Sequence, residues 1–206
     1  MNFAIIDKQV VEHKSPSTRF IVRVWFAMTI IIMFCIILPK HSRAADLGLL
    51  SIGFRAQVGE KSTVLGKEQP ESFEENDIVA SIQLPWEGQS LSDWELHTVL
   101  LASAGVLRGA NTTALVASAI PALAFGRLDK RFTVELGVGL ALLSKHRFAQ
   151  QEYGGPLQFA LSFGVGVPLY RRVGVGYRFM HYSDAGLYGS DTIGADFHMV
   201  ELIYRY

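Results

Sequence analysis

Residues 157–169 read LQFALSFGVGVPL, and this short stretch decides the fold class of the chain. Large apolar side chains stand at every second position from Leu157 to Leu169, and small or polar side chains stand between them. Alternation with a period of two predicts a β-strand with one apolar face. Gly164 and Gly166 lie on the other face, which indicates that this face is crowded or sharply curved.

The same pattern returns in residues 132–142, FTVELGVGLAL. A soluble β-sandwich also buries a large apolar face, but its other face meets water and carries more charged and hydroxyl side chains than glycine and alanine. Bulky residues on one face and small or polar residues on the other are typical of a narrow membrane barrel, whose interior is filled by side chains. The sequence therefore predicts a barrel whose large apolar side chains point outward to lipid.

Six further segments have the length and composition of strands. They are residues 49–57, 77–84, 96–107, 114–125, 172–183 and 197–206. The alternation is poor in 96–107 and 114–125, so their register stays open. The total is then eight, the smallest even number that is common in outer-membrane barrels. We therefore expect an all-β protein, an eight-stranded antiparallel transmembrane β-barrel of the outer-membrane type.

The connections and the last strand predict how the barrel is oriented. Long polar connections, expected at the outer surface, occupy residues 58–76, 145–156 and 184–195, and short periplasmic ones occupy 86–93, 126–131 and 170–171. The last segment alternates and stops on Tyr206. It resembles the C-terminal strand that bacterial outer-membrane proteins present to the barrel assembly machinery. This resemblance implies that its end is periplasmic and that residues 184–195 lie at the outer surface.

The N-terminal 45 residues predict a secretory signal peptide. Basic residues precede an apolar run at 24–38, and the small residues Ala44 and Ala45 follow it. The run has 15 residues, fewer than the roughly 20 that a spanning helix needs. The charged region before the apolar run is long for a signal peptide, so an uncleaved membrane anchor stays open as an alternative. Residues 46–206 are then expected to form one domain, without the single cysteine, Cys35.

The last two segments bring together the residue types of a hydrolytic triad. Counting by twos from Val173 points His181 and Ser183 outward, and counting back from Tyr206 points Asp196 to the same side. A serine hydroxyl needs a base to take its proton, and the base needs an acid to hold its tautomer. Residues i and i+2 are about 6.6 to 7 Å apart along a strand, a gap that histidine and serine side chains can bridge. The alternative is that these residues merely begin a solvated loop.

The motif HYSDAG at residues 181–186, followed by Gly-X-acid at 194–196 and an aromatic terminal strand, resembles the C-terminal signature of the lipid A 3-O-deacylase (PagL) family. The resemblance is strong over residues 177–206 and only architectural over 46–169. It implies an outer-membrane barrel that hydrolyses the ester-linked acyl chain at position 3 of lipid A. It also implies His181 as the base, Ser183 as the nucleophile and Asp196 as the acid, with lipopolysaccharide as the substrate.

Two positions depart from the family pattern. The acid is usually glutamate, so Asp196 is one methylene shorter. The residue after the nucleophile is usually asparagine, which the family is thought to use near the oxyanion, and here it is Asp184. An ionised carboxylate there would repel the oxyanion, and the loss of one oxyanion donor costs about 10²- to 10³-fold in rate. A catalytically weak or inactive structural or adhesive barrel therefore stays open, as does a phospholipase or acyltransferase.

Other polar and aromatic residues are expected to play supporting roles. Tyr177 and Phe179 share the outward face and are expected to line the path of the acyl chain. His198 is expected to line it too, and the alternative is an interfacial histidine without a role. An inward polar network is expected from Gln83, Glu135, Gln158, Arg178, Glu201 and Arg205. No two histidines stand at metal-ligand spacing with a carboxylate nearby, so we expect no metal and no cofactor.

The charge balance excludes one class of partner. The chain has 19 basic and 19 acidic residues, so no basic patch for nucleic acid is expected. The expected partners are lipid A, the outer membrane and the barrel assembly machinery, and a homodimer stays open.

Overall fold

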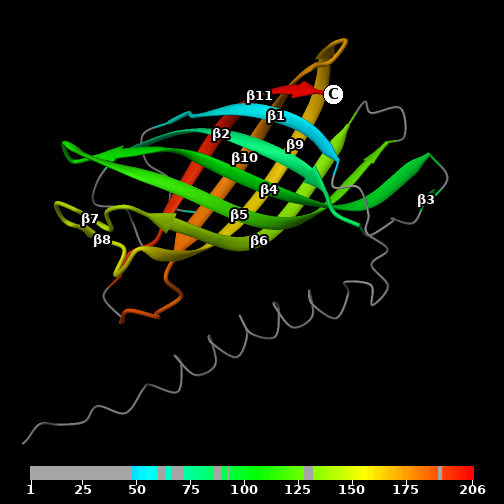
Figure 1. Ribbon diagram of the computed structural model, residues 1–206. Helices are drawn as coiled ribbons and strands as arrows, with labels where there is room; N and C mark the ends of the chain where they lie inside the picture. Colours follow the sequence, from blue (N-terminus) through cyan, green and yellow to red (C-terminus); the bar gives the residue numbers. More distant parts are fainter. Residues whose placement is uncertain are drawn as a thin grey trace, which may run out of the picture.

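The computed structural model describes residues 48–59, 64–65, 72–85, 90–91, 93–127, 132–189 and 192–206, so the predicted signal peptide at 1–45 lies outside it. Within the described residues, eight long strands form a closed antiparallel barrel (Figure 1). They are β1 (Leu49–Gln57), β2 (Phe73–Gln83), β4 (Trp94–Gly109), β5 (Thr112–Arg127), β6 (Thr133–Leu143), β9 (Leu157–Tyr170), β10 (Val173–Ser183) and β11 (Ala195–Arg205). None of the described residues belongs to a helix that is long and apolar enough to cross a membrane.

Each barrel strand pairs with its neighbour in the chain, and β11 closes the barrel by pairing with β1. Three short strands lie outside this order. The strand β3 (Ser90–Leu91) pairs with the first two residues of β4. The strand β7 (Arg147–Phe148) pairs with β8 (Gln151–Glu152) to form a small hairpin. The predicted all-β, eight-stranded barrel is therefore confirmed.

The two strands whose register was open are the longest in the barrel. Both β4 and β5 have 16 residues and extend the predicted segments by two residues at each end. Ala110 and Asn111 join them in a tight turn with φ of 45° and 60°. Positive φ at both central residues is the geometry of the type I′ turn, whose twist matches that of the strands. β2 starts at Phe73, earlier than predicted. Its Glu75 and Asp77 side chains point inward and bond to Tyr182 and Arg55, whereas Glu74 is exposed.

The side chains of the strands point to the sides that the alternation predicted, with large apolar residues outward and small or polar residues inward. On β6, Leu136 and Leu140 are 53% and 44% exposed, whereas Ala141 is buried. On β9, Gln158 and Ser162 are buried inside the barrel. The exposed leucines belong to a belt of outward apolar side chains, which is the surface that a membrane barrel presents to lipid.

The barrel has one end with long loops and one with short turns. The long-loop end carries the connections from β1 to β2, from β6 to β9 and from β10 to β11, together with the tight turn at Ala110–Asn111. The other end, the short-turn end, carries the connections that follow β2, β5 and β9. Aromatic side chains project from strand ends at the short-turn end: Trp94 stacks on Phe125 with ring centroids 4.8 Å apart, and Tyr204 contacts Tyr206 edge to face at 5.5 Å. Such aromatic residues are typical of a membrane interface.

Aromatic side chains fill the barrel interior near the long-loop end. Phe148 and Tyr153, which belong to the connection between β6 and β9, pack against Phe73 with ring centroids 5.2 and 5.8 Å away. All three are almost completely buried. The connection therefore folds back into the barrel and supports the wall from inside.

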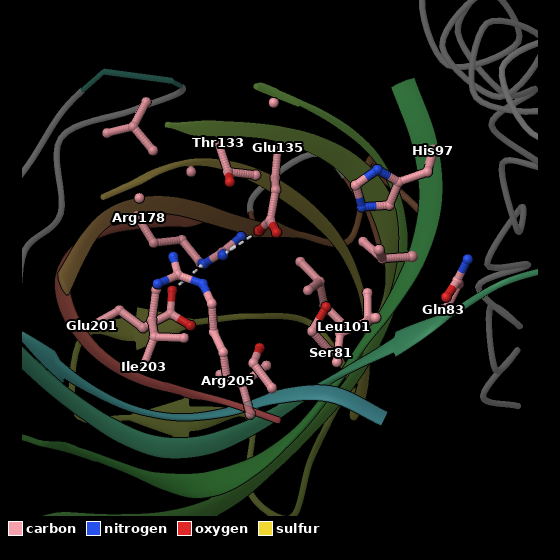
Figure 2. Close-up of a pocket in the computed structure, with 18 of the residues that line it drawn as sticks. Ser81, Gln83, His97, Leu101, Thr133, Glu135, Arg178, Glu201, Ile203 and Arg205 are labelled. Carbon is pink, nitrogen blue, oxygen red and sulfur yellow. Dashed lines mark hydrogen bonds and ion pairs between the residues drawn. The ribbon is translucent and has the colours of Figure 1, made fainter. Parts of the chain in front are cut away.

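Charged side chains occupy the middle of the interior, as the parity of the strands predicted. Arg178 donates to Glu135 at 2.5 Å and to Glu201 at 3.1 Å (Figure 2). It also donates to Ser162 at 3.0 Å. Arg55 forms two hydrogen bonds with Asp77. Toward the short-turn end, a cavity of about 320 Å³ is lined by Glu135, Arg178, Glu201, Arg205 and His97, together with further polar and apolar residues.

Candidate active site

The hairpin of β10 and β11 carries the predicted site on the outward face of the barrel. His181 lies directly across from Asp196 in the strand register, two residue pairs beyond Phe179 and His198. His181 Nδ1 and Asp196 Oδ1 are 2.5 Å apart. The Asp196 side chain is 1% exposed and that of His181 is 15% exposed. The structure thus joins the predicted base and acid in a hydrogen bond.

Ser183 follows His181 by two residues, at the end of β10, on the same face and half-buried. Gly194 lies beside both of them. A methyl group at Gly194 would lie 3.1 Å from His181 Cε1 and 3.2 Å from Ser183 Cβ. The Cε1 edge of the imidazole and the Ser183 side chain therefore border one small space, which the absence of a side chain at Gly194 leaves open.

The acid is held from a part of the chain that the sequence analysis did not consider. Asp196 Oδ2 accepts hydrogen bonds from the backbone N–H groups of Val64 at 2.6 Å and Leu65 at 2.7 Å. These donors lie in the connection between β1 and β2. Parity predicts an outward Asp196 at the edge of the lipid zone, and the contact explains why it is nonetheless buried. Backbone donors have no residue-type signature, so no sequence pattern could have indicated them.

Asp184 has a different environment from the one expected beside the nucleophile. Its carboxylate accepts the backbone N–H groups of Gly186 and Tyr188, each at 3.0 Å, and the hydroxyl of Thr192 at 2.8 Å. The side chain is almost fully buried. The carboxylate therefore closes the turn that follows Ser183, and three hydrogen bonds direct its charge into its own loop.

A second loop supports the same turn from the other side. Gln151 of β8 donates from its side-chain amide to the carbonyl oxygens of Ile193 at 2.9 Å and Gly194 at 3.2 Å, and it is completely buried. The neighbouring Glu152 accepts the N–H of Ile193 through its carbonyl oxygen at 3.0 Å. Its side chain binds Arg147, which lowers the pKa of that carboxyl below its usual value. Sequence analysis missed Gln151, because an isolated glutamine in a loop gives no signal.

The outward wall next to the triad residues is aromatic. The Tyr177 hydroxyl and His198 Nδ1 share a hydrogen bond. The Phe179 ring centroid is 5.4 Å from that of His198. The three residues expected to line the substrate path therefore form one cluster, further along the hairpin toward the short-turn end.

This arrangement is suited to a defined kind of chemistry. A histidine oriented by a buried carboxylate, with a hydroxyl two residues away on the same face, supplies the residue types that activate a serine for attack on an ester when the hydroxyl and the imidazole come within hydrogen-bond distance. It lies on the surface that faces lipid, so a membrane-embedded ester is the substrate type that can reach it. Among the described residues, no group of three His, Cys, Asp or Glu side chains is placed to hold a metal ion.

Comparisons with known proteins agree with the fold and with the family resemblance. Residues 77–205 match the sequence profile of a family described as lipid A 3-O-deacylase (PagL). The lipid A deacylase PagL of Bordetella bronchiseptica is 34% identical over 90 residues, which cover 44% of this chain and 48% of that protein. The match thus spans about half the length of this relative. The crystal structure of the outer membrane enzyme PagL resembles the barrel with a TM-score of 0.61 at 19% identity, over 76% of this chain and 99% of that chain.

Proposed function

Because the chain belongs to the lipid A 3-O-deacylase (PagL) family, we propose that it is an ester hydrolase that removes the acyl chain at position 3 of lipid A. The family and the barrel fold indicate the bacterial outer membrane as its location. The observation that carries the proposal is the 2.5 Å contact of His181 with Asp196 on the outward wall, with Ser183 two residues further along that face. Lipid A can approach such a wall sideways within the outer leaflet.

In the proposed mechanism, the Ser183 hydroxyl attacks the ester carbonyl carbon while His181 Nε2 takes the hydroxyl proton. His181 Nδ1–H donates to Asp196, which holds the tautomer and stabilises the imidazolium. Collapse of the tetrahedral intermediate breaks the bond to the sugar oxygen, and His181 returns the proton to that oxygen. Water then attacks the acyl-serine with His181 again as the base, which releases the fatty acid and regenerates Ser183.

The aromatic wall supports the assignment of the acyl path. Tyr177 is 37% exposed and, with Phe179, covers the outward face next to His181. The His198 ring is held between these two aromatic rings, so we assign it to the wall that the acyl chain contacts. Cleavage of residues 1–45 and recognition of the last strand by the barrel assembly machinery stay predictions, and a homodimer stays open.

The experiment compares lipid A masses in a bacterium whose lipid A is fully acylated. Expression of the wild-type chain should remove one 3-hydroxyacyl group, and Ser183→Ala should leave lipid A intact. Ser72→Ala, a change of an exposed serine in the connection between β1 and β2, is the matched control and should act like the wild type.

Other outcomes separate the alternatives. Unchanged lipid A with a barrel that is folded in the outer membrane would favour a structural or adhesive protein. Loss of phospholipid acyl chains, or transfer of an acyl chain to another acceptor, would favour a phospholipase or an acyltransferase.

A further inference from the structure

The connection between β1 and β2 reaches the site from far away in the chain. Val64 and Leu65 are separated from Asp196 by 132 and 131 residues, yet their N–H groups lie 2.6 and 2.7 Å from Asp196 Oδ2. Both residues precede the segment 77–205 that matches the family profile. Because His181 contacts the other oxygen, Oδ1, the carboxylate is fixed through both of its oxygens.

We propose that Val64–Leu65 is a positioning element of the active site, whose paired backbone N–H groups fix the Asp196 carboxylate in the orientation that His181 requires. The inference rests on the proposed function and adds to it a segment outside the catalytic hairpin. An aspartate side chain can rotate its carboxylate about the last bond, and a rotation would turn Oδ1 away from His181. Two N–H donors on Oδ2 oppose that rotation.

The side chains of the segment do not account for the contact. Val64 is 61% exposed and Leu65 is 38% exposed, so the backbone approaches the site while much of both side chains remains at the surface. The positioning therefore depends on the N–H groups and not on the residue types. The role of the N–H group can therefore be separated from that of the side chain. Alanine keeps the N–H group and removes most of the side chain, whereas proline removes the N–H group.

The experiment measures lipid A deacylation by the purified full-length protein in detergent micelles for Val64→Ala, Leu65→Ala, Val64→Pro and Leu65→Pro. Because the alanine variants keep the N–H groups, they should lose much less activity than the proline variants. The proline variants should lose about 10- to 10²-fold in kcat, the cost of a small misplacement of a catalytic group, with KM little changed. A further variant replaces Leu65 by its α-hydroxy analogue, which exchanges the N–H for an ester oxygen and keeps the side chain.

A second readout follows His181 directly. In protein labelled with ¹⁵N-histidine, the Nδ1 proton of His181 should resonate far downfield in the wild type, as expected for a short hydrogen bond to a carboxylate, and Asp196→Asn identifies the signal by abolishing it. The proline variants and the α-hydroxy variant should shift this proton upfield, and the alanine variants should leave it unchanged. Folding of each variant is checked on SDS gels, where an unheated, folded barrel migrates faster than the same protein after heating.

Each result decides the proposal. A folded α-hydroxy variant with wild-type kcat and an unshifted His181 proton would overturn it, as would alanine variants that lose as much activity as the proline variants. If the wild type itself does not deacylate lipid A, the proposed function fails, and the His181 proton still decides whether the segment positions Asp196.

Discussion

Gly194 controls the space between the two side chains that are proposed to react. A methyl group there would lie 2.7 Å from the Tyr182 carbonyl oxygen and close to both His181 and Ser183. The φ of Gly194 is not in the left-handed region, so this torsion angle allows alanine, but the 2.7 Å approach to a backbone oxygen means that the chain at Gly194 or Tyr182 must shift. The consequence of a side chain at this position is therefore a displacement of the site and not a strained turn.

We expect Gly194→Ala to reduce deacylation by about 10²-fold, because a displacement of roughly 1 Å has a cost of that order, while the barrel remains folded. The measurement is the rate on lipid A together with the gel migration of the unheated protein. Gly48→Ala is the matched control, since a methyl group there meets only Gln83 Oε1 at 3.8 Å. A Gly194→Ala variant with the full rate would show that the space is not needed.

Asp184→Asn should lower activity, although charge repulsion alone predicts a gain. Asparagine has one side-chain oxygen, whereas Asp184 accepts three hydrogen bonds through two. A lost bond to a charged group costs about 1.5 to 3 kcal/mol, so the turn after Ser183 should loosen. Limited proteolysis within residues 184–194 and the deacylation rate report the two effects.

Asp93→Asn, an exposed change at the short-turn end, is the control for Asp184→Asn. A higher rate in Asp184→Asn with an intact loop would restore the argument from repulsion of the oxyanion.

At the scale of elements, alternation predicted the barrel strands because each has a face that meets lipid and a face that meets a crowded interior. The two faces therefore select different residue types at alternate positions, as in β9. It also predicted that His181, Ser183 and Asp196 share the outward side. The ends of β4 and β5 were underestimated because alternation is poor along both segments and does not mark where these strands stop.

The loops could not be predicted in the same way. Their contacts at the site are made by backbone N–H and carbonyl groups: Val64 and Leu65 donate to Asp196, and Ile193 and Gly194 accept from Gln151. Every residue type carries these groups, so a pattern of side chains does not reveal which loop lies against which. The residues of the site were therefore predictable, but the loop contacts that hold them in place were not.

The β7–β8 hairpin should influence catalysis through Gln151. Gln151→Leu removes both hydrogen bonds to residues 193–194 and keeps a side chain of similar size. We expect the deacylation rate to fall several-fold and the backbone amides of 192–196 to exchange hydrogen faster, because buried carbonyl groups without donors are costly. Gln150→Leu, a neighbouring exposed position, is the comparison variant. Equal exchange in both variants would mean that the hairpin does not support the site.

For the whole molecule, Arg178 is the centre of the interior. It joins β10 to β6, β9 and β11 through Glu135, Ser162 and Glu201. Removing one partner of a buried ion pair leaves an uncompensated charge, at a cost of about 3 to 5 kcal/mol. Arg178→Met should therefore lower the unfolding midpoint in urea, while the fraction that is folded keeps the normal deacylation rate per molecule.

Arg172→Met, an exposed arginine in the turn between β9 and β10, controls for loss of a positive charge. An Arg178→Met barrel as stable as the wild type would indicate that water in the neighbouring cavity replaces the ion pairs.

The position of His181 and Ser183 on the outer wall determines how the proposed reaction depends on its surroundings. Enzyme and substrate would meet by diffusing in the plane of one leaflet, so the turnover rate should follow the number of lipid A molecules per unit of membrane area and not their concentration in bulk solution. Both products would be released into that same leaflet. Dilution of the membrane with inert lipid should therefore slow the reaction, whereas dilution of the whole sample with buffer should not.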